Sequence, residues 1–476
     1  MNIALILLIL LVGAIVTYFS GNRLARITAL LFAVASAVFS IALYFQVGGG
    51  AGIEYEQLWI SNPQVMFSLK ADGLSIAMLL LTTIMLPVVL LSAVSQEFKR
   101  ERLFYALVMF MAFAMAGSFL SSNALLYYIF WEMSLIPIYF IVILWGNGEI
   151  ENRRQAAMTF FMHTFGGSLF MLASIIYLYT QAGSFQLDDF YALDLSLTEQ
   201  IWVFLGFFLA FAIKIPIFPF HTWQADVYKR APAVGTMLLA GLMSKMGAYS
   251  ILRWQIPVVP EAALELRPYV LVLCIIGVLY GAFVALQQDD IKRFLAFASL
   301  SHVGFVAAGA YSLTFDGIQG SIILIVAHGV AIIGLFYAAE IIRIRTEKSK
   351  ISEMGGYMHK AAKFGAAFFL LVLAAISMPI SFNFIGEFTI MLGLYGVSLW
   401  YVIFIGLSLI FGAYMFLRMY QQVMLGAAPK EEFRELSVKE GFILLYIITI
   451  IIYFGVNSGP IADLVRPAVD QIIANI

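Results

Sequence analysis

Residues 208–223 read FLAFAIKIPIFPFHTW, an apolar run that contains a lysine, Lys214, and two prolines. Pro216 and Pro219 lack a backbone N–H, so a helix formed by this run must break there and leave carbonyl groups free within a turn. In lipid, such a break is tolerated only inside protein or beside a water-filled cavity. The run therefore predicts an interrupted membrane-spanning helix with a lysine at the interruption.

The composition of the whole chain is that of a membrane protein. Of 476 residues, 62% are hydrophobic and 12% are charged, and the mean hydropathy is +0.95. An average soluble domain carries about 25% charged residues. This composition excludes a disordered chain, a nucleic-acid-binding surface and an ordinary soluble enzyme. One cysteine, Cys274, is too few for disulfides, four-cysteine zinc sites or iron–sulfur clusters. Because phosphate-binding glycine motifs are also absent, we expect no metal and no cofactor in this chain.

Apolar runs of spanning length number fourteen along the sequence. The first lacks a preceding basic residue and a cleavage site, so it predicts a membrane helix and not a signal peptide. Lys and Arg gather in alternate loops, which places both termini on the non-cytoplasmic side. The polar last stretch, 459–476, is expected on the surface. The runs cover approximately residues 2–20, 27–46, 73–95, 103–120, 122–145, 157–181, 201–220, 232–254, 268–287, 291–311, 318–342, 361–396, 399–425 and 440–457.

A faint internal repeat links the two halves of the chain. GAYSILR at 247–253 returns as GAYMFLR at 412–418, and the same offset lays KIPIFPF at 214–220 against PISFNFI at 379–385. The offset contains five predicted spans, an odd number, so successive copies would be inverted in the membrane. Inverted repeats with helices broken at matching positions are typical of transporters and indicate the ion site.

Ionisable groups inside the predicted spans are the candidate functional residues, because each costs about 2.5–3.5 kcal/mol at the bilayer centre on insertion scales. Glu132 lies mid-span, and we expect it to pair with Lys214. A lysine with a carboxylate partner holds its proton, and a buried lysine that loses its partner releases it. The pair could therefore act as a proton switch. The alternative is a static ion pair that only locks two helices.

Four further groups extend this set. Lys245 lies mid-span among small residues, with no carboxylate near it in sequence. His302 and His328 lie in consecutive spans, and imidazole can receive and release a proton at different nitrogens. Glu387 follows the second predicted break, which suits a terminal proton site. The set predicts a proton relay in the membrane plane, although the histidines could also be hydrogen-bonded core residues.

Four motifs carry a family resemblance: FWEMSLIPIYF (130–140), AIKIPIFPFHTWQADVYKRAPAVGTMLLAGLMSKMGAYSILR (212–253), QQDDIKRFLAFASLSHVGFV (287–306) and FNFIGEF (382–388). Together they resemble the antiporter-like subunits of respiratory complex I, which are related to Mrp-type antiporter subunits. The resemblance covers approximately residues 70–425. The glutamate at position 387 is similar to that of the M-type branch, because the sister subunits usually place a lysine there.

The resemblance implies an all-α polytopic membrane protein of about fourteen helices. Spans 4–8 and 9–13 would form two inverted five-helix repeats, with spans 7 and 12 broken. The implied organisation is an N-terminal three-helix segment (1–102), a first repeat (103–255), a second repeat (256–426) and a C-terminal helix with its tail (427–476). The resemblance also implies a proton relay of Glu132, Lys214, Lys245, His302, His328 and Glu387.

The resemblance further implies a proton-translocating subunit of NADH:quinone oxidoreductase, an enzyme whose NADH, flavin, iron–sulfur clusters and quinone bind in partner subunits. The expected partners are other membrane-arm subunits, especially sister antiporter-like subunits, within the bacterial inner membrane. Alternatives are a subunit of an Mrp-type cation/proton antiporter and a hydrogenase-linked membrane arm. A purely structural anchor is the alternative outside transport.

Overall fold

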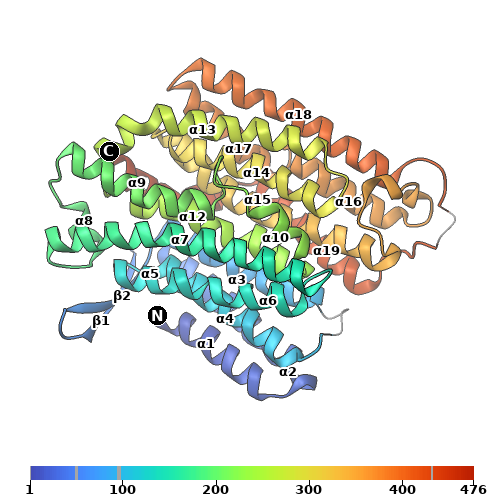
Figure 1. The fold of residues 1–476 in the computed structure, drawn as a ribbon, viewed down its shortest axis with the longest axis horizontal. Helices are drawn as coiled ribbons and strands as arrows, with labels where there is room; N and C mark the ends of the chain where they lie inside the picture. The colour runs from blue at the N-terminus through green and yellow to red at the C-terminus, as the bar shows by residue number, and fades with distance from the viewer. Residues whose placement is uncertain (1, 49–51, 94–97, 430–431) are drawn as a thin grey trace.

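The computed structural model describes residues 2–48, 52–93, 98–429 and 432–476. Most of these residues lie in helices, and the long helices run roughly alongside one another (Figure 1). Both chain termini and a β-hairpin lie at the same end of this bundle, at the left of Figure 1.

Eleven helical segments among the described residues are long and apolar enough to cross a membrane. One of them, Ala124–Trp145, consists of two consecutive helices, α5 and α6. These segments are α2 (Asn22–Val47), α3 (Gly73–Ala93), α4 (Glu101–Leu120), α5 (Ala124–Met133) with α6 (Leu135–Trp145), α7 (Ile150–Ala182), α9 (Leu197–Lys214), α13 (Pro260–Leu286), α14 (Ile291–Ala310), α15 (Phe315–Thr346), α18 (Leu399–Met424) and α19 (Val438–Val456).

Shorter helices complete the chain. Ala233–Gln255 is a continuous helical run in which α-helical and π-helical turns alternate: α11 (Ala233–Met237), a π-helix (Leu238–Met243), α12 (Ser244–Ser250) and a second π-helix (Ile251–Gln255). Short 3₁₀ turns cover Ile351–Glu353 and Tyr357–His359. The remaining helices are α1 (Ala4–Phe19), α8 (Leu187–Tyr191), α10 (Gln224–Arg230), α16 (Ala362–Ala375), α17 (Phe382–Tyr395) and α20 (Gly459–Ala474).

Both predicted breaks occur. The seventh span ends as α9 at Lys214, and the chain re-enters a helix only at Gln224. The twelfth span is divided into α16 and α17 around Pro379. The polar tail forms the amphipathic helix α20, whose buried residues lie on one face.

The expectation of an all-α chain is wrong at one place. Strand β1 (Ile53–Ile60) pairs with β2 (Val65–Ala71) in an antiparallel hairpin, with Ile53 opposite Ala71. Much of β1 is exposed, whereas β2 turns several side chains into the protein. Strand β2 ends at Ala71 and α3 begins at Gly73, so Asp72 lies between the hairpin and α3.

The core is apolar and α15 runs through it. Every residue of the apolar window of α15 is buried, against 22% for α18 at the outer edge of the bundle. Polar side chains cap several helices that surround this core: Asn123 accepts from two backbone N–H groups of α5, and Asp290 does the same for α14. These caps fix where the site-bearing spans begin.

Candidate functional site: a buried relay between two helix breaks

The carbonyl groups that are freed at the first break find hydrogen-bond partners within the protein. The carbonyl of Ala212, freed by the prolines, accepts from the backbone N–H of Ile217 at 2.7 Å. The carbonyl of Ile213 accepts from the indole N–H of Trp223 at 3.0 Å. Because these groups are satisfied within the protein, the break is stable at membrane depth and Lys214 is held at the last turn of α9.

Lys214 is 2% exposed. Its Nζ donates to the hydroxyl of Ser134 at 3.2 Å and lies 4.8 Å from the centre of the Trp131 ring. Both neighbours come from the span that carries Glu132. The expected direct ion pair with Glu132 is not formed: no Lys214–Glu132 contact within 4.0 Å exists among the described residues. The two charges still interact electrostatically.

Glu132 and Lys214 form a separated pair, because they interact electrostatically without direct contact. The Oε1 atom of Glu132 is buried and has no hydrogen-bond partner among the described residues. Glu132 lies two positions before Ser134 in the same span. The role of Glu132 and Lys214 as a proton switch stays a prediction.

The span that carries Glu132 is interrupted, which the sequence analysis did not predict. Helix α5 ends at Met133 and α6 begins at Leu135, with Ser134 between them. Pro137 supplies the reason, because it cannot donate a hydrogen bond to the carbonyl four residues earlier, at Met133. Ser134 keeps helical dihedral angles (φ −69°, ψ −23°), so α5 and α6 remain one span with a local irregularity at the residue that holds Lys214.

Lys245 lies between the two π-helical segments and is 2% exposed. Its Nζ donates to the carbonyl of Ala240 at 2.8 Å and to the hydroxyl of Ser244 at 3.2 Å. A π-helical turn shifts the backbone hydrogen bonds, and such turns are frequent at functional sites. Within the described part of the chain no carboxylate forms an ion pair with Lys245.

The two histidines and Glu387 form a contiguous group. His302 Nδ1 lies 2.8 Å from Glu387 Oε1. The rings of His302 and His328 stack with their centres 5.1 Å apart. His328 Nε2 lies 3.0 Å from the hydroxyl oxygen of Ser299. Lys245 interacts electrostatically with His328. Lys245, His328, His302 and Glu387 thus follow one another across the second half of the protein.

A small cavity of about 10 Å³ adjoins the last member of this group. That volume is close to the minimum that holds a water molecule. It is lined by His302 and Glu387 on one side and by Ser408 and Gly412 of α18 on the other. The cavity places the end of the relay next to the outermost helix of this half.

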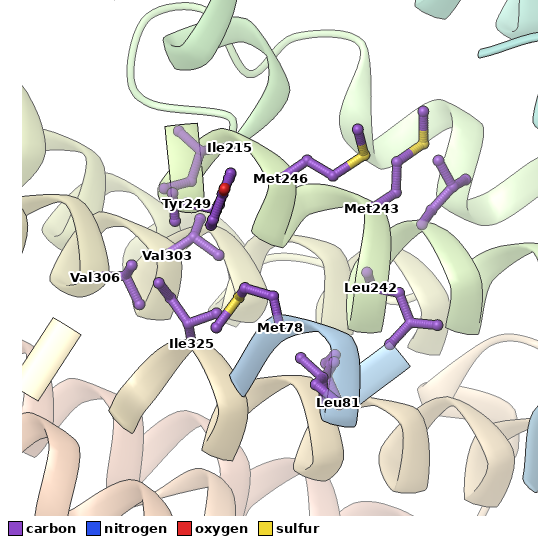
Figure 2. Packing of buried hydrophobic residues seen from close by; sticks show 14 of the residues in the cluster. Met78, Leu81, Ile215, Leu242, Met243, Met246, Tyr249, Val303, Val306 and Ile325 are labelled. Carbon is purple, nitrogen blue, oxygen red and sulfur yellow. The ribbon is translucent and has the colours of Figure 1, made fainter. Parts of the chain in front are cut away.

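No direct contact joins Lys214 to Lys245 among the described residues, so the relay is not continuous there. The two spans nevertheless meet closely: a Cβ on Gly247 would lie 2.8 Å from the backbone nitrogen of Ile215. Apolar side chains, including Met246 and Ile325, pack in the same region (Figure 2). A proton crossing this segment needs water between the apolar side chains.

One buried ion pair was not predicted. Arg253 Nη2 lies 2.5 Å from Asp72, whose carboxylate also accepts from the backbone N–H of Ser75. Arg253 lies in the last turn of the helical run that carries Lys245, and its carbonyl accepts from the Tyr191 hydroxyl at 2.7 Å. The pair therefore connects Asp72, directly after the hairpin, to the helical run that carries Lys245.

Nothing among the described residues gathers three or more His, Cys, Asp or Glu side chains in a metal-binding arrangement. The absence of a metal or cofactor in this chain stays a prediction.

Comparisons with known proteins agree with the motifs. The family model described as NADH:quinone oxidoreductase/Mrp antiporter, TM, matches residues 121–412. A relative from Rickettsia prowazekii, named NADH-quinone oxidoreductase subunit M, is 32% identical, with 99% of this chain and 98% of the relative covered.

Solved structures share the fold over the whole length. A chain of respiratory complex I from Thermus thermophilus with bound NADH has a TM-score of 0.93 at 29% identity, covering 100% of this chain and 99% of that chain. A chain of the Mrp complex from a Dietzia species has a TM-score of 0.91 at 17% identity, covering 99% and 97%, which shows the fold alone. The matched motifs, the full-length relative and the shared fold agree, and the chain belongs to the NADH:quinone oxidoreductase/Mrp antiporter membrane-subunit family.

Proposed function

We propose that this chain is a proton-translocating membrane-arm subunit of NADH:quinone oxidoreductase. The observation that carries the proposal is the buried succession of Lys245, His328, His302 and Glu387, together with the separated Glu132 and Lys214. Titratable groups are expensive at membrane depth and are retained there chiefly for ion or proton pathways. The redox chemistry that supplies energy takes place in other subunits of the assembly.

The first pair acts as the switch of this relay. When Lys214 approaches the Glu132 carboxylate, the pair is charged and the lysine holds its proton. When Lys214 turns to Ser134, as observed, its proton is easier to release toward the second half of the protein. Moving one charge against 100 mV costs about 2.3 kcal/mol, so rearranging one buried ion pair has the required magnitude.

We also propose the full membrane topology. The eleven long segments, together with α1, the run Ala233–Gln255 and the broken α16–α17 segment, would make fourteen crossings. An even number fits the position of both termini at one end of the bundle (Figure 1). Two inverted repeats would cover 103–255 and 256–426, because each then contains a broken helix as its fourth span. The termini would face away from the cytoplasm of a bacterial inner membrane.

The partners follow from the same assignment. The chain lacks the cysteines that iron–sulfur clusters require, so electrons must be handled elsewhere in the assembly. We assign sister antiporter-like subunits and the remaining membrane-arm subunits as its neighbours, within a lipid bilayer. Purification of the intact assembly and identification of the co-purifying chains tests this assignment.

The functional test uses inverted membrane vesicles that contain the assembled complex. Lys214→Ala and Lys245→Ala should each lower NADH-driven proton uptake while the complex is still assembled and NADH is still oxidised by an artificial acceptor. Lys360→Ala is the matched control, because that lysine is exposed and far from the relay. Wild-type proton uptake in both relay variants would exclude the relay.

The same vesicles separate the proposal from an Mrp-type antiporter. An antiporter is driven by an ion gradient, so a sodium gradient imposed without NADH would move protons through it. We expect no such movement here, and proton uptake only when NADH is supplied. Sodium-driven proton movement that Lys214→Ala abolishes would favour the antiporter.

A further inference from the structure

Asn383, in the first turn of α17, is a fully buried polar residue that the relay described above does not use. Its exposed fraction is 0%, and neither its amide nitrogen nor its amide oxygen has a hydrogen-bond partner among the described residues. Glu387, one turn later on the same helix, also has one carboxylate oxygen, Oε2, that is buried without a partner. Buried polar groups that lack partners cost free energy, so each requires an explanation.

Glycine contacts fix the level of Asn383 relative to the histidines. A Cβ on Gly386 would lie 2.7 Å from Leu324, and one on Gly320 would lie 2.7 Å from the nitrogen of Ile390. Helices α17 and α15 are therefore antiparallel and in backbone contact. Asn383 precedes Gly386 by about one turn on α17, and His328 follows Leu324 by about one turn on α15. Because the two helices are antiparallel, Asn383 and His328 lie at the same level.

Helix α14 completes this layer. A Cβ on Gly309 of α14 would contact Ile390 at 2.7 Å, so Ile390 faces α14 as well as α15. Asn383 precedes Ile390 by seven positions, two helical turns, and lies on the same face of α17. His302 precedes Gly309 by the same seven positions on α14. Asn383, His302 and His328 therefore occupy one layer, and Glu387 lies one turn from it.

The structure assigns Asn383 as the anchor of a buried water site between the imidazole pair and Glu387. We propose that one or two water molecules bind there, hydrogen-bonded to the Asn383 amide and to Glu387 Oε2. An amide offers two donors and one acceptor oxygen, so it can orient water toward both neighbours. Asn383 is a positioning residue in this proposal, which rests on the proton relay proposed above.

Such a site gives the relay a second connection. His302 already contacts Glu387 Oε1 directly, but His328 reaches Glu387 only through the His302 ring. Water held by Asn383 would accept a proton from His328 and donate another to Oε2 of Glu387, which restores the water molecule. A cavity of about 10 Å³ lies beside Glu387 and His302, at the end of the relay that the proposed water would contact through Oε2.

Packing offers the competing explanation, and two substitutions separate it from a water site. Asn383→Leu preserves the volume of the side chain and removes its polarity, so it fills the site with an apolar group. Asn383→Ala removes the side chain and leaves room for water. A packing role predicts that leucine is tolerated and alanine is harmful. A water site predicts the opposite order.

The measurement is the ratio of proton uptake to NADH oxidation in inverted vesicles, with the assembled complex quantified by native electrophoresis. Glu387→Gln provides the reference for a blocked relay. We expect Asn383→Leu to fall to the ratio of that reference and Asn383→Ser to keep the wild-type ratio. Asn383→Ala should lie between them, because the water keeps its space but loses the amide that holds it. The serine variant keeps a hydrogen-bonding group beside the added water.

Each outcome decides between the two proposals. A wild-type ratio in Glu387→Gln would overturn the relay itself. If Glu387→Gln is impaired but Asn383→Leu matches the wild type, the water site alone is wrong. If Asn383→Ala assembles fully and keeps the wild-type ratio, the amide does not hold the water, and the proposal also fails. That last result decides the question even if the leucine variant does not assemble.

Discussion

Breaking the Asp72–Arg253 pair should destabilise the protein more than removing both partners. The two side chains are 16% and 8% exposed, so either one left alone is a buried, uncompensated charge. Removing one partner of a buried pair costs about 3–5 kcal/mol, whereas replacing both by uncharged groups is often close to neutral. We therefore expect Asp72→Asn and Arg253→Met each to cost about 3–5 kcal/mol, and the double variant to cost less than either.

The assay is a double-mutant cycle on the free energy of unfolding, measured by detergent titration of the purified full chain in mixed micelles. The expected coupling free energy is about 3 kcal/mol or more. Single-variant costs that add within about 0.5 kcal/mol would refute the reasoning, because independent sites behave in that way. Lys360→Met is the matched control for loss of a surface cation.

The pair also predicts a pH dependence. Burial raises the pKa of Asp72, but the Arg253 charge and its hydrogen bonds outweigh burial and hold the pKa below its ordinary value. A carboxyl whose pKa is lower in the folded state stabilises the protein above its unfolded pKa, about 3.9. That contribution is lost as pH falls through the folded pKa. The loss of stability below about pH 4 should be smaller in Asp72→Asn.

Two further predictions concern packing and capping. Gly247→Ala should destabilise the protein by about 1–3 kcal/mol, because its Cβ would meet backbone of Ile215, and thermal stability of the assembled complex should fall. Gly412→Ala, the equivalent position of the repeated motif, has open space and should be tolerated. Glu435→Gln should cost about 1 kcal/mol in a thermal melt, because the Glu435 carboxylate accepts from two backbone N–H groups at the start of α16. Burial opposes ionisation of Glu435, but these bonds lower its pKa, so its contribution should disappear as the medium is acidified below about pH 4.3. Equal melting temperatures for the two alanine variants, or an acid sensitivity unchanged by Glu435→Gln, would contradict these expectations.

The membrane class and the two broken spans could be predicted because they follow from local chemistry. Apolar runs of about 20 residues require a bilayer, and Pro216 and Pro379 remove backbone donors wherever they occur. The same logic applied to Pro137 would have predicted the interruption at Ser134. That signal was present in the sequence and was not used.

The hairpin and the π-helical turns had weaker signals. Strand β1 carries polar side chains, Glu54 and Glu56, at alternate positions, but a single exposed hairpin is a small feature beside long apolar runs. The π-helical turns around Lys245 depend on contacts with other helices, such as the approach of Gly247 to Ile215. No pattern within their own sequence determines them.

The relay residues were identified because charge is rare in spans, but their mutual contacts depend on tertiary structure. Sequence alone suggested Lys214 with Glu132, and the structure places the lysine on Ser134. The contact of His302 with Glu387 joins residues 85 positions apart, and no local rule could pair them.

The glycine contacts between α15 and α17 also bear on where this half of the protein can move. Gly386 and Gly320 bring the two backbones together without intervening side chains, so we expect α15 and α17 to move as one rigid unit. Helix α18 has only 22% of its apolar window buried within the chain, and it lines the small cavity beside Glu387. We therefore expect the small movements that let water in or out at the end of the relay to come from α18. A chemical cross-link between α18 and α14 should slow turnover without altering a titratable group.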